Sequence, residues 1–377
     1  MSFRDNYRDI ICRLARFRTK SDFETVKTVG IIDALIERAS TIDEGALPDM
    51  PLGTVPGHTI ENFAGRAERY LSALERGEYP LKGMFTEPGK ALVDHSFVQK
   101  DGKLHIFYNI GAIGYEWSER YVDSFGHAWT EDLVNWHIEP RVLYTEPNGI
   151  ECYQIWSPGV VQKGDTYYMY YTGVNYNVAQ CQCLATSKDL YNWEKYGNNP
   201  VLLPGPWNDW SADKWSDCRD AFVFMEDDGT AYMYYCTAVS GNGVYNAAVG
   251  MAKSDDMIHW EDLGFKEFGK DIHALESPFV MKKDGLYYLF YTKVGHGSAY
   301  AVSDAPFGDW EDKGMIIPTD GRYDWISHVP SCSEVFEFKG EWYISCAWRH
   351  PGCEQYLEIF KLTFNSDGSV TLGERIS

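Results

Sequence analysis

One hairpin pattern recurs five times along the chain and constrains its fold more than any other feature. Glu276–Thr292, ESPFVMKKDGLYYLFYT, has a polar start, an apolar run, a charged turn with Gly, and an aromatic strand. Apolar and aromatic residues on both sides of such a turn are typical of a β-hairpin. The other four copies are Asp94–Asn109, Ser157–Thr172, Asp220–Cys236 and Ser333–Ala347.

A second motif follows four of these hairpins and completes a larger repeat. It places a Ser/Thr-Asp turn between a third strand and a fourth strand, with Trp at the start of the fourth. Its copies are Thr130–Trp136, Ser187–Trp193, Ser254–Trp260 and Ser303–Trp310. The fifth hairpin is followed by strand-like Tyr356–Phe364 and Ser369–Leu372 without the Trp. A repeated unit of four short strands is typical of a propeller blade.

The repeats therefore predict an all-β fold, a five-bladed β-propeller over residues 86–377 that forms one domain. The repeated Trp residues are expected to be structural and to pack between blades. The expected blades are Ala91–Leu143, Ile155–Leu202, Cys218–Leu263, Ala274–Ile317 and Ser331–Leu372.

Residues 1–85 differ from the rest and predict an N-terminal helical extension. Apolar residues recur there at helical spacing in two stretches. One hypothesis is that these helices brace a face of the propeller, and the other is that they form a homodimer arm. The apolar positions are Ile10, Ile11, Leu14 and Phe17, then Ile60, Phe63, Ala67, Leu71 and Leu74.

Charge and composition exclude several classes of partner. The net charge is −21 and the pI is about 4.8, which argues against nucleic acids and anionic membranes because both require a basic face. No apolar run is long enough for a membrane span, and the first residues lack a signal-peptide core. The nine cysteines have no metal-type spacing; we expect Cys181 and Cys183 to point to opposite faces of a strand. A cytoplasmic protein with reduced cysteines, no metal and no cofactor is expected.

Three acids align at the starts of the first strands. Asp94 and Asp220 occupy the same repeat position as Ser157, Ser277 and Ser333, and Glu276 stands one place earlier, as Arg219 does before Asp220. The first strand of each blade lines the central channel, so these side chains should meet at one mouth. An Asp at a strand start is often only a turn or cap residue. Three acids at one mouth instead favour catalysis, because crowding separates carboxyl pKa values into acid and base roles, as glycoside hydrolysis requires.

The motifs resemble those of the five-bladed β-propeller glycosidases, the superfamily of glycoside hydrolase families 32, 43, 68, 117 and 130. Phe125–Pro140 and Gln182–Pro200 are similar to stretches of family 32, the invertases, levanases and inulinases. Cys218-Arg219-Asp220 resembles the Arg-Asp-Pro motif of that family, and Glu276-Ser277-Pro278 resembles its Glu-Cys-Pro motif. The similarity covers roughly residues 90–350.

The resemblance implies a role for each matching residue. Asp94 would be the nucleophile, Glu276 the general acid/base, and Asp220 the stabiliser that binds sugar hydroxyls. Arg219 would hold and orient its neighbours.

Some motifs depart from family 32. Leu92–Ser96 stands where that family has Asn-Asp-Pro-Asn-Gly, so the identity of the sugar is open. Trp156-Ser157-Pro158 and Glu276-Ser277-Pro278-Phe279 also resemble the Trp-Ala-Pro and Glu-Gly-Pro motifs of family 43, mostly inverting arabinofuranosidases and xylosidases. The N-terminal helices are similar to those of family 117.

Several residues near the expected mouth are candidate substrate ligands. His95 follows Asp94 and is either a packed histidine or a ligand. Trp156 could stack on a sugar or belong to the core between blades, whereas Trp117 in a long loop is a better candidate for stacking. His328 alone is not evidence for a metal. Weaker candidates are Tyr153, Gln154 and Trp325.

The resulting hypothesis is an exo-acting glycoside hydrolase that cleaves a terminal furanoside, β-fructofuranosidase-like and with retention. The substrate would be an oligosaccharide or a small glycoside. The first alternative is an inverting arabinofuranosidase or xylosidase of family 43 type. The second is a non-catalytic sugar-binding propeller, which would not require Asp94, Asp220 and Glu276 together.

Overall fold

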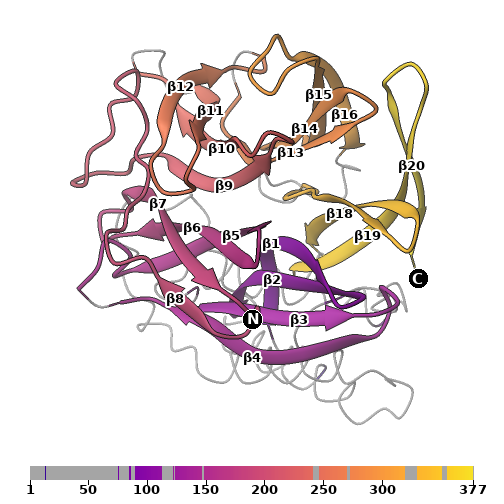
Figure 1. The fold of residues 1–377 in the computed structure, drawn as a ribbon, viewed down its shortest axis with the longest axis horizontal. Helices are drawn as coiled ribbons and strands as arrows, with labels where there is room; N and C mark the ends of the chain where they lie inside the picture. Colours follow the sequence, from indigo (N-terminus) through magenta and orange to yellow (C-terminus); the bar gives the residue numbers. More distant parts are fainter. Residues whose placement is uncertain are drawn as a thin grey trace, which may run out of the picture.

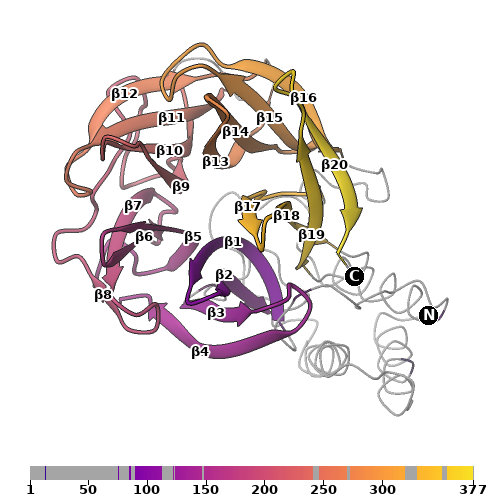
Figure 2. The same cartoon turned by 45° about the vertical axis from the view of Figure 1, so that its right-hand side comes forward.

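The computed structural model describes nearly all of the repeat region. The described residues are 90–112, 122, 124–146, 148–240, 246–269, 272–318, 329–349 and 355–376, with the isolated positions Arg13, Glu75 and Phe85. They contain twenty strands in five sheets, and each sheet has four antiparallel strands in sequential order. The predicted five-bladed β-propeller is therefore confirmed (Figures 1 and 2).

Blades one and three follow the expected boundaries closely, whereas the last strand of blade two ends at Lys195 and not at the expected Leu202. Blade one has β1 (Lys90–Lys100), β2 (Lys103–Ala112), β3 (Ser124–Thr130) and β4 (Trp136–Tyr144). Blade two has β5 (Gln154–Lys163), β6 (Thr166–Val174), β7 (Gln180–Ser187) and β8 (Trp193–Lys195). Blade three has β9 (Cys218–Met225), β10 (Ala231–Ala238), β11 (Ala247–Ser254) and β12 (Glu261–Lys266).

The last two blades complete the ring. Blade four has β13 (Leu275–Lys283), β14 (Leu286–Lys293), β15 (Gly297–Ser303) and β16 (Glu311–Pro318). Blade five has β17 (Val335–Phe338), β18 (Glu341–Arg349), β19 (Gln355–Phe364) and β20 (Val370–Arg375). The strands β1, β5, β9, β13 and β17 lie innermost in Figure 2 and surround the centre, as expected for the first strand of a blade.

The core of the protein lies between the blades. The described residues form five large apolar clusters, and each is built from two neighbouring blades. Tyr171 of β6, for example, packs with Phe107 of β2, while Tyr170, the residue before it, packs with Tyr235 of β10. Successive strand residues face opposite sides of a sheet, so an aromatic run on the second strand supplies both interfaces of its blade.

Blade five closes the ring against blade one, mainly through side chains. The amide of His95 bonds to Cys332 Sγ at 3.2 Å, and the amide of Phe97 bonds to Glu334 Oε2 at 2.8 Å. Phe85 adds a backbone contact, because it forms a β-bridge with Leu357 of β19. Its ring is 1% exposed and stacks on Trp136 of blade one, with ring centroids 4.7 Å apart.

The Ser/Thr-Asp turns have a common hydrogen-bond pattern that explains their repetition. Asp132 Oδ1 accepts bonds from the amides of Val134 and Asn135, while Thr130 Oγ1 accepts the amide of Leu133. Ser187 with Asp189 and Ser254 with Asp256 repeat these contacts. Side-chain oxygens thus replace backbone acceptors in a tight connection, which is the physical role of Asp and Ser in turns.

The predicted N-terminal extension lies outside the described residues, apart from three positions. Arg13 and Glu75 are both helical. Their side chains form a bidentate ion pair, in which Arg13 Nε lies 3.0 Å from Glu75 Oε1 and Nη2 lies 2.7 Å from Oε2. The bracing and homodimer hypotheses both stay predictions. In the described part of the chain, no helix has the length and apolar character required to cross a membrane.

Candidate active site

A β-bulge lies at four of the five aligned positions, those of Asp94, Ser157, Asp220 and Ser277. Pairing of the first and second strands shifts between Leu92 and His95, and likewise around residues 157–158, 220–221 and 277–278. A bulge re-aims a side chain and is common beside active sites. Ser157, Asp220 and Ser277 have φ of +47°, +58° and +49°, which is uncommon for residues other than glycine and is often maintained at functional sites.

The bulges bring Asp94 and Asp220 to opposite sides of one hydroxyl. Ser157 Oγ lies 2.7 Å from Asp94 Oδ2 and 2.6 Å from Asp220 Oδ1. Asn109 of β2 donates a further bond to Asp94 Oδ2 at 3.0 Å. The structure therefore joins two of the three predicted acids, from blades one and three, through a residue of blade two.

The Ser157 hydroxyl has a single hydrogen and can donate to only one of these oxygens. Both contacts are hydrogen bonds when one carboxyl group is protonated and donates to the serine oxygen, while the serine donates to the other carboxyl group. Burial and the neighbouring charge of Asp94 raise the pKa of Asp220 to about 7. The raised pKa makes Asp220 the carboxyl that favours the protonated form, while Asp94 receives donors from Ser157 and Asn109.

Arg219 connects the third acid to this group. It precedes Asp220 on β9, and its Nη2 donates to Glu276 Oε1 of β13 at 2.9 Å. The same guanidinium bonds to Asp217 and to Gln180 Oε1, and its Nε lies 3.8 Å from Asp220 Oδ2. The planar donors of Arg219 therefore bind carboxylates on both sides, as expected for a residue that orients its neighbours.

The three acids differ strongly in exposure. The side chain of Asp220 is 6% exposed, whereas that of Glu276 is 31% exposed. A buried acid whose pKa is raised and a more open acid beside one arginine are chemically distinct groups. The arrangement can stabilise positive charge that develops near Asp94 and can exchange a proton with a group that approaches Glu276.

Backbone donors fix these side chains across blade boundaries. The amide of Ser157 bonds to Asn109 Oδ1 at 2.9 Å, and the amide of Asp220 bonds to Thr172 Oγ1 at 2.9 Å. The amide of Ser277 donates to Asp220 Oδ2 at 3.2 Å. Each first strand is thus held by a polar side chain or carboxylate of the preceding blade, which fixes the geometry of the mouth.

The channel is nearly filled beyond the acids. A cavity of about 20 Å³, room for a single water molecule, is lined by first-strand residues that include Asp94, Asp220 and Glu334. Glu334 is 7% exposed, and burial raises its pKa to about 8. A ligand therefore reaches the acids from the mouth and not through the channel.

Three predicted ligands are buried in the structure. His95 is 2% exposed and lies 2.8 Å from Ser345 Oγ through its Nε2, at the contact with blade five, which fits the packed alternative. Trp156 is 8% exposed and donates from Nε1 to Gln154 Oε1 at 2.9 Å. Gln154 is itself 4% exposed, so this pair supports the mouth and presents little surface to a ligand.

Trp117, Trp325 and His328 lie outside the described residues, so their predicted roles stay predictions. The prediction for Cys181 and Cys183 was wrong. Their sulfur atoms lie 3.9 Å apart, because residues two apart on a strand share a face. Among the residues that the structure does describe, no cluster of three His, Cys, Asp or Glu side chains is suited to a metal ion.

Three residues at the mouth were missed or given no role by sequence reasoning. Ser157 was aligned with Asp94 but not expected to bond to it. Asp217, which binds Arg219, stands two residues before it, immediately ahead of β9, a spacing that could have revealed it. Trp215 is 45% exposed and donates to Asp217 Oδ1 at 3.1 Å.

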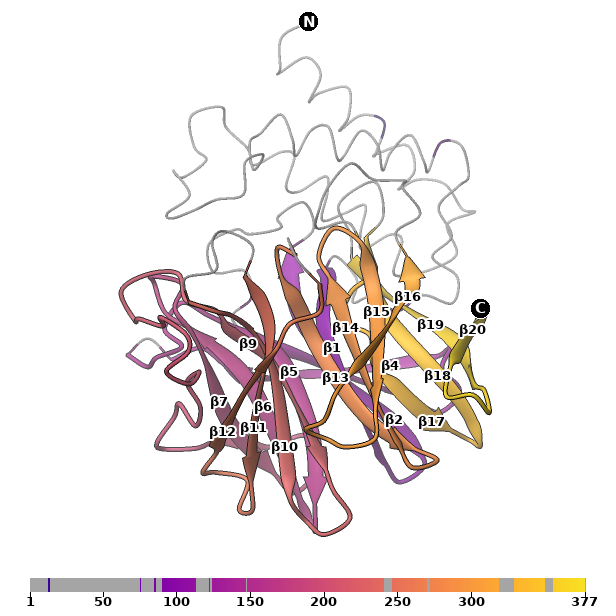
Figure 3. The same cartoon turned by 90° about the horizontal axis from the view of Figure 1, so that it is seen from above.

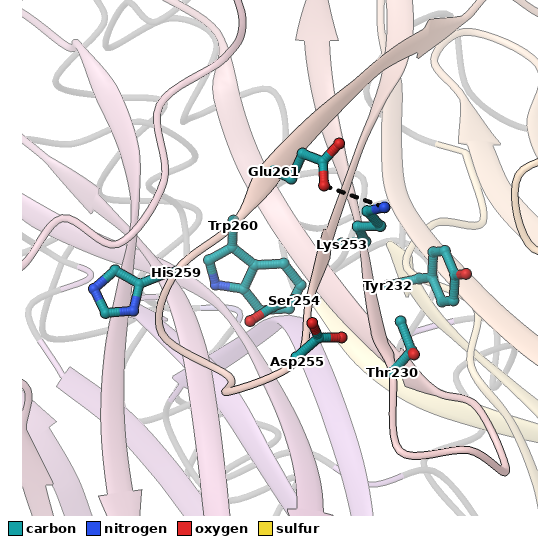
Figure 4. Close-up of a pocket in the computed structure, with 8 residues that line it drawn as sticks. All are labelled: Thr230, Tyr232, Lys253, Ser254, Asp255, His259, Trp260 and Glu261. Carbon is teal, nitrogen blue, oxygen red and sulfur yellow. Dashed lines mark ion pairs between the residues drawn. The ribbon is translucent and has the colours of Figure 1, made fainter.

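A separate hollow lies on blade three (Figure 4). The strand bounds place it at the end of the blade opposite to the beginning of β9, where Asp220 lies. It is lined by the β9–β10 and β11–β12 turns, with Trp260 and Tyr232 among its side chains and the Lys253–Glu261 ion pair of 3.1 Å at its edge. None of the predicted site residues belongs to it. Figure 3 shows β9 and β13 running between the two ends of the propeller. The acids instead lie near the beginnings of the first strands β1, β9 and β13.

Known proteins resemble the chain in sequence over this same region. The model of the glycosyl hydrolases family 32 N-terminal domain matches residues 94–278, from Asp94 to just beyond Glu276. A xylosidase/arabinosidase of Bacteroides ovatus is 25% identical over 331 residues, which cover 75% of this chain and 95% of that protein. A sucrose:sucrose 1-fructosyltransferase of Festuca arundinacea is 30% identical over 152 residues, 34% of this chain and 22% of that protein.

A solved structure supports the same fold. A thermostable family-43 glycoside hydrolase superimposes with a TM-score of 0.60 at 18% sequence identity. The match covers 76% of this chain and 95% of that chain. At this identity the similarity establishes the five-bladed architecture alone.

Proposed function

Since the chain belongs to the superfamily of five-bladed β-propeller glycoside hydrolases that includes families 32 and 43, we propose that it removes a terminal furanosyl residue from an oligosaccharide or small glycoside. The observation that carries this proposal is the group of three acids. Asp94 and Asp220 share the Ser157 hydroxyl, and Arg219 holds Glu276 beside them. The nearly filled channel below them suits a substrate that enters from one end.

In the proposed reaction Asp94 attacks the anomeric carbon while Glu276 protonates the leaving oxygen. The bond to the leaving group breaks and a glycosyl ester forms on Asp94. Glu276 then removes a proton from water, whose oxygen attacks the anomeric carbon and releases Asp94 as a carboxylate. Asp220 and Asn109 lie beside Asp94, where they contribute hydrogen bonds to the sugar hydroxyls and to the nucleophile.

A β-fructofuranoside is the first proposed substrate. The matching family 32 domain runs through all three acids, and the Arg219-Asp220 and Glu276 motifs resemble those of that family. The second candidate is an arabinofuranoside or xyloside. It is favoured by the xylosidase/arabinosidase relative, whose match extends over most of both chains.

A panel of substrates tests the two candidates. We expect release of fructose from sucrose, inulin-type or levan-type oligosaccharides, and no sugar from aryl α-L-arabinofuranoside or β-D-xyloside. The configuration of the first product, followed by NMR, should be that of the substrate. Arabinose or xylose with inverted configuration would establish the second candidate, with Asp94 as a general base. Binding of these sugars without turnover would favour the non-catalytic alternative.

A further inference from the structure

Trp215 is an unusually exposed aromatic residue next to the acids. It lies in the connection between β8 and β9, four residues before Arg219, and 45% of its surface is exposed. Its indole nitrogen donates to Asp217 Oδ1 at 3.1 Å. Asp217 also binds Arg219, whose other side binds Glu276 at 2.9 Å. Three successive contacts therefore connect the Trp215 ring to Glu276.

The loop that carries Trp215 is held rigidly. Ser216 Oγ bonds to the amide of Ser211 at 3.0 Å and to its carbonyl at 2.9 Å. The backbone of Ser216 forms a β-bridge with Ala179, and the carbonyl of Ala212 accepts a bond from Asn175 at 2.9 Å. Because the polar edge of the indole is bonded to Asp217, the ring faces are what this residue offers to a ligand.

A second exposed aromatic residue occupies the adjacent turn between β6 and β7. Tyr176 is 51% exposed, and its ring centroid lies 5.5 Å from that of Tyr153. The residues on either side of it, Asn175 and Asn177, both donate to the carbonyl of Ala212 in the Trp215 loop. Two exposed rings are thus presented by two loops that are bonded together at the end of the propeller where the acids lie.

The difference in exposure between Asp220 and Glu276 indicates which part of a substrate would contact the rings of Trp215 and Tyr176. Asp220 is buried and Glu276 is more open, so the sugar that is removed lies deep and the leaving group extends toward solvent past Glu276. Trp215 is linked to Glu276, and not to the buried sugar position, through the contacts of Asp217 and Arg219. The C–H face of a sugar ring packs well on an aromatic face, where it loses contact with water and gains dispersion contacts.

We propose that Trp215 is the platform for the first sugar on the leaving-group side of the cleaved bond, and that Tyr176 extends it for the next sugar. The substrate class that this surface fits is an oligosaccharide: two sugar residues reach Trp215, and a third reaches Tyr176. The inference rests on the proposed function, because Glu276 defines the leaving-group side. It makes Trp215 a specificity-determining residue that does not take part in bond cleavage.

Matched substrates with and without leaving-group sugars test this inference. For each sugar, kcat/KM is measured on a methyl glycoside and on an oligosaccharide: methyl β-D-fructofuranoside with 1-kestose, methyl α-L-arabinofuranoside with arabinotriose, and methyl β-D-xylopyranoside with xylotriose. Trp215→Ala should lower kcat/KM about tenfold on the oligosaccharide, a loss of about 1.4 kcal/mol, and less than about twofold on the methyl glycoside. Trp215→Phe should retain most of the activity.

The control is Phe307→Ala, which removes a similarly exposed ring (48%) from the β15–β16 turn at the opposite end of the propeller. It should leave both substrates unaffected. Equal losses by Trp215→Ala on the two substrates would show a structural role and overturn the inference, as would no loss on either substrate.

A binding measurement separates this inference from the proposed function. Glu276→Gln, with and without Trp215→Ala, is titrated with the same trisaccharides by calorimetry. If the wild type releases no sugar but Trp215→Ala weakens binding about tenfold, the proposed hydrolase function is wrong and the proposed role of Trp215 in sugar binding is supported. If trisaccharides bind equally with and without Trp215, or do not bind at all, the platform is overturned.

Discussion

Ser157 is the residue on which the geometry of the acids depends most. Its hydroxyl lies within 2.7 Å of both Asp94 and Asp220, and this is possible because one of the two carboxyl groups holds a proton. Asp94 thereby keeps a hydrogen-bond partner in a site that contains three more acidic side chains, those of Asp217, Asp220 and Glu276, and one arginine. The serine hydroxyl therefore connects two nearby carboxyl groups, so that the protonation of one affects the protonation of the other.

Removal of this hydroxyl should lower activity without unfolding the protein. Ser157→Ala removes one hydrogen bond to a charged group, worth about 1.5–3 kcal/mol, and kcat/KM should fall roughly 10- to 100-fold. The pH profile of kcat/KM should also change, because Asp220 loses its partner. Ser277→Ala is the matched comparison, since Ser277 has the same bulge position but contacts Asp220 through its backbone amide. Equal effects of the two variants would contradict the role of the Ser157 hydroxyl.

Asp220 also makes stability depend on pH. Its pKa is raised from 3.8 to about 7 in the folded protein, so the folded state binds a proton that the unfolded state has lost. This contribution is fully present below pH 4 and is lost as the pH rises through 7. The wild type should lose up to about 4 kcal/mol of unfolding free energy from this group between pH 4 and pH 8.

Asp220→Asn cannot titrate and should lack this component. Chemical denaturation at several pH values should therefore show the variant gaining stability relative to the wild type as the pH rises from 4 to 8. Two parallel curves would mean that Asp220 does not hold a proton in the folded protein.

Among the elements, β2 and β3 carry an unusual buried pair of histidines. His105 Nδ1 lies 3.0 Å from His127 Nε2, and the ring of Phe107 stacks on His127 with centroids 4.5 Å apart. Burial lowers the pKa of His105 to about 4 and that of His127 to about 3. Both rings are therefore neutral in the folded state at pH 5 to 7, whereas the unfolded chain takes up protons below about pH 6.5.

This pair should make the packing of blade one sensitive to acid. The stability that it contributes is present above pH 6.5 and is lost as the pH falls toward 4. His127→Gln should destabilise the protein at pH 7, but the difference from the wild type should narrow by about 2 kcal/mol at pH 5. Denaturation curves at both pH values measure this, with the exposed His259→Gln as control. A difference that is independent of pH would show that His127 has the same pKa in the folded and unfolded states.

The sequence was sufficient to predict the blades but not all of the side chains between them. Turns and aromatic strands are local features, so the five hairpins and the alignment of Asp94 with Asp220 were correct. Blade five was less accurate: its first strand is only Val335–Phe338, whereas the expected blade began at Ser331. Cys332, Ser333 and Glu334 line the channel cavity as irregular backbone instead.

Two kinds of contact near the channel could not be predicted: those that depend on side-chain conformation and those that join residues far apart in the chain. The bond between Trp156 and Gln154 removes two expected ligands from the mouth, and it depends on side-chain conformations that no local pattern fixes. The bond from Ser157 to Asp220 depends in turn on two bulges and on the closeness of two blades. Trp215 was within a connection expected to carry function, but its exposure becomes evident only in the structure.

At the scale of the whole molecule, the site exists only when the ring is closed. Asp94, Asp220 and Glu276 come from blades one, three and four, and no two of them share a hairpin. Closure depends on the contact between blades one and five, where Phe85 packs against Trp136 and Tyr108 and pairs with Leu357.

Phe85→Ala should therefore destabilise the ring. Loss of a fully buried phenylalanine costs about 3–5 kcal/mol of unfolding free energy. The exposed Phe307→Ala should change it by no more than about 0.5 kcal/mol. Chemical denaturation of the two variants measures both values. A loss below about 1 kcal/mol in Phe85→Ala would show that the contact does not hold the ring closed.

The most direct test of the account is sugar release by the wild type, Asp94→Asn and Glu276→Gln on the substrate for which the wild type is most active. We predict that the wild type releases a monosaccharide and that both folded variants lose activity by about 10²- to 10⁴-fold or more, because each lacks a group that reacts directly. Release by either variant at the rate of the wild type would contradict the account and would place the chemistry elsewhere in the protein.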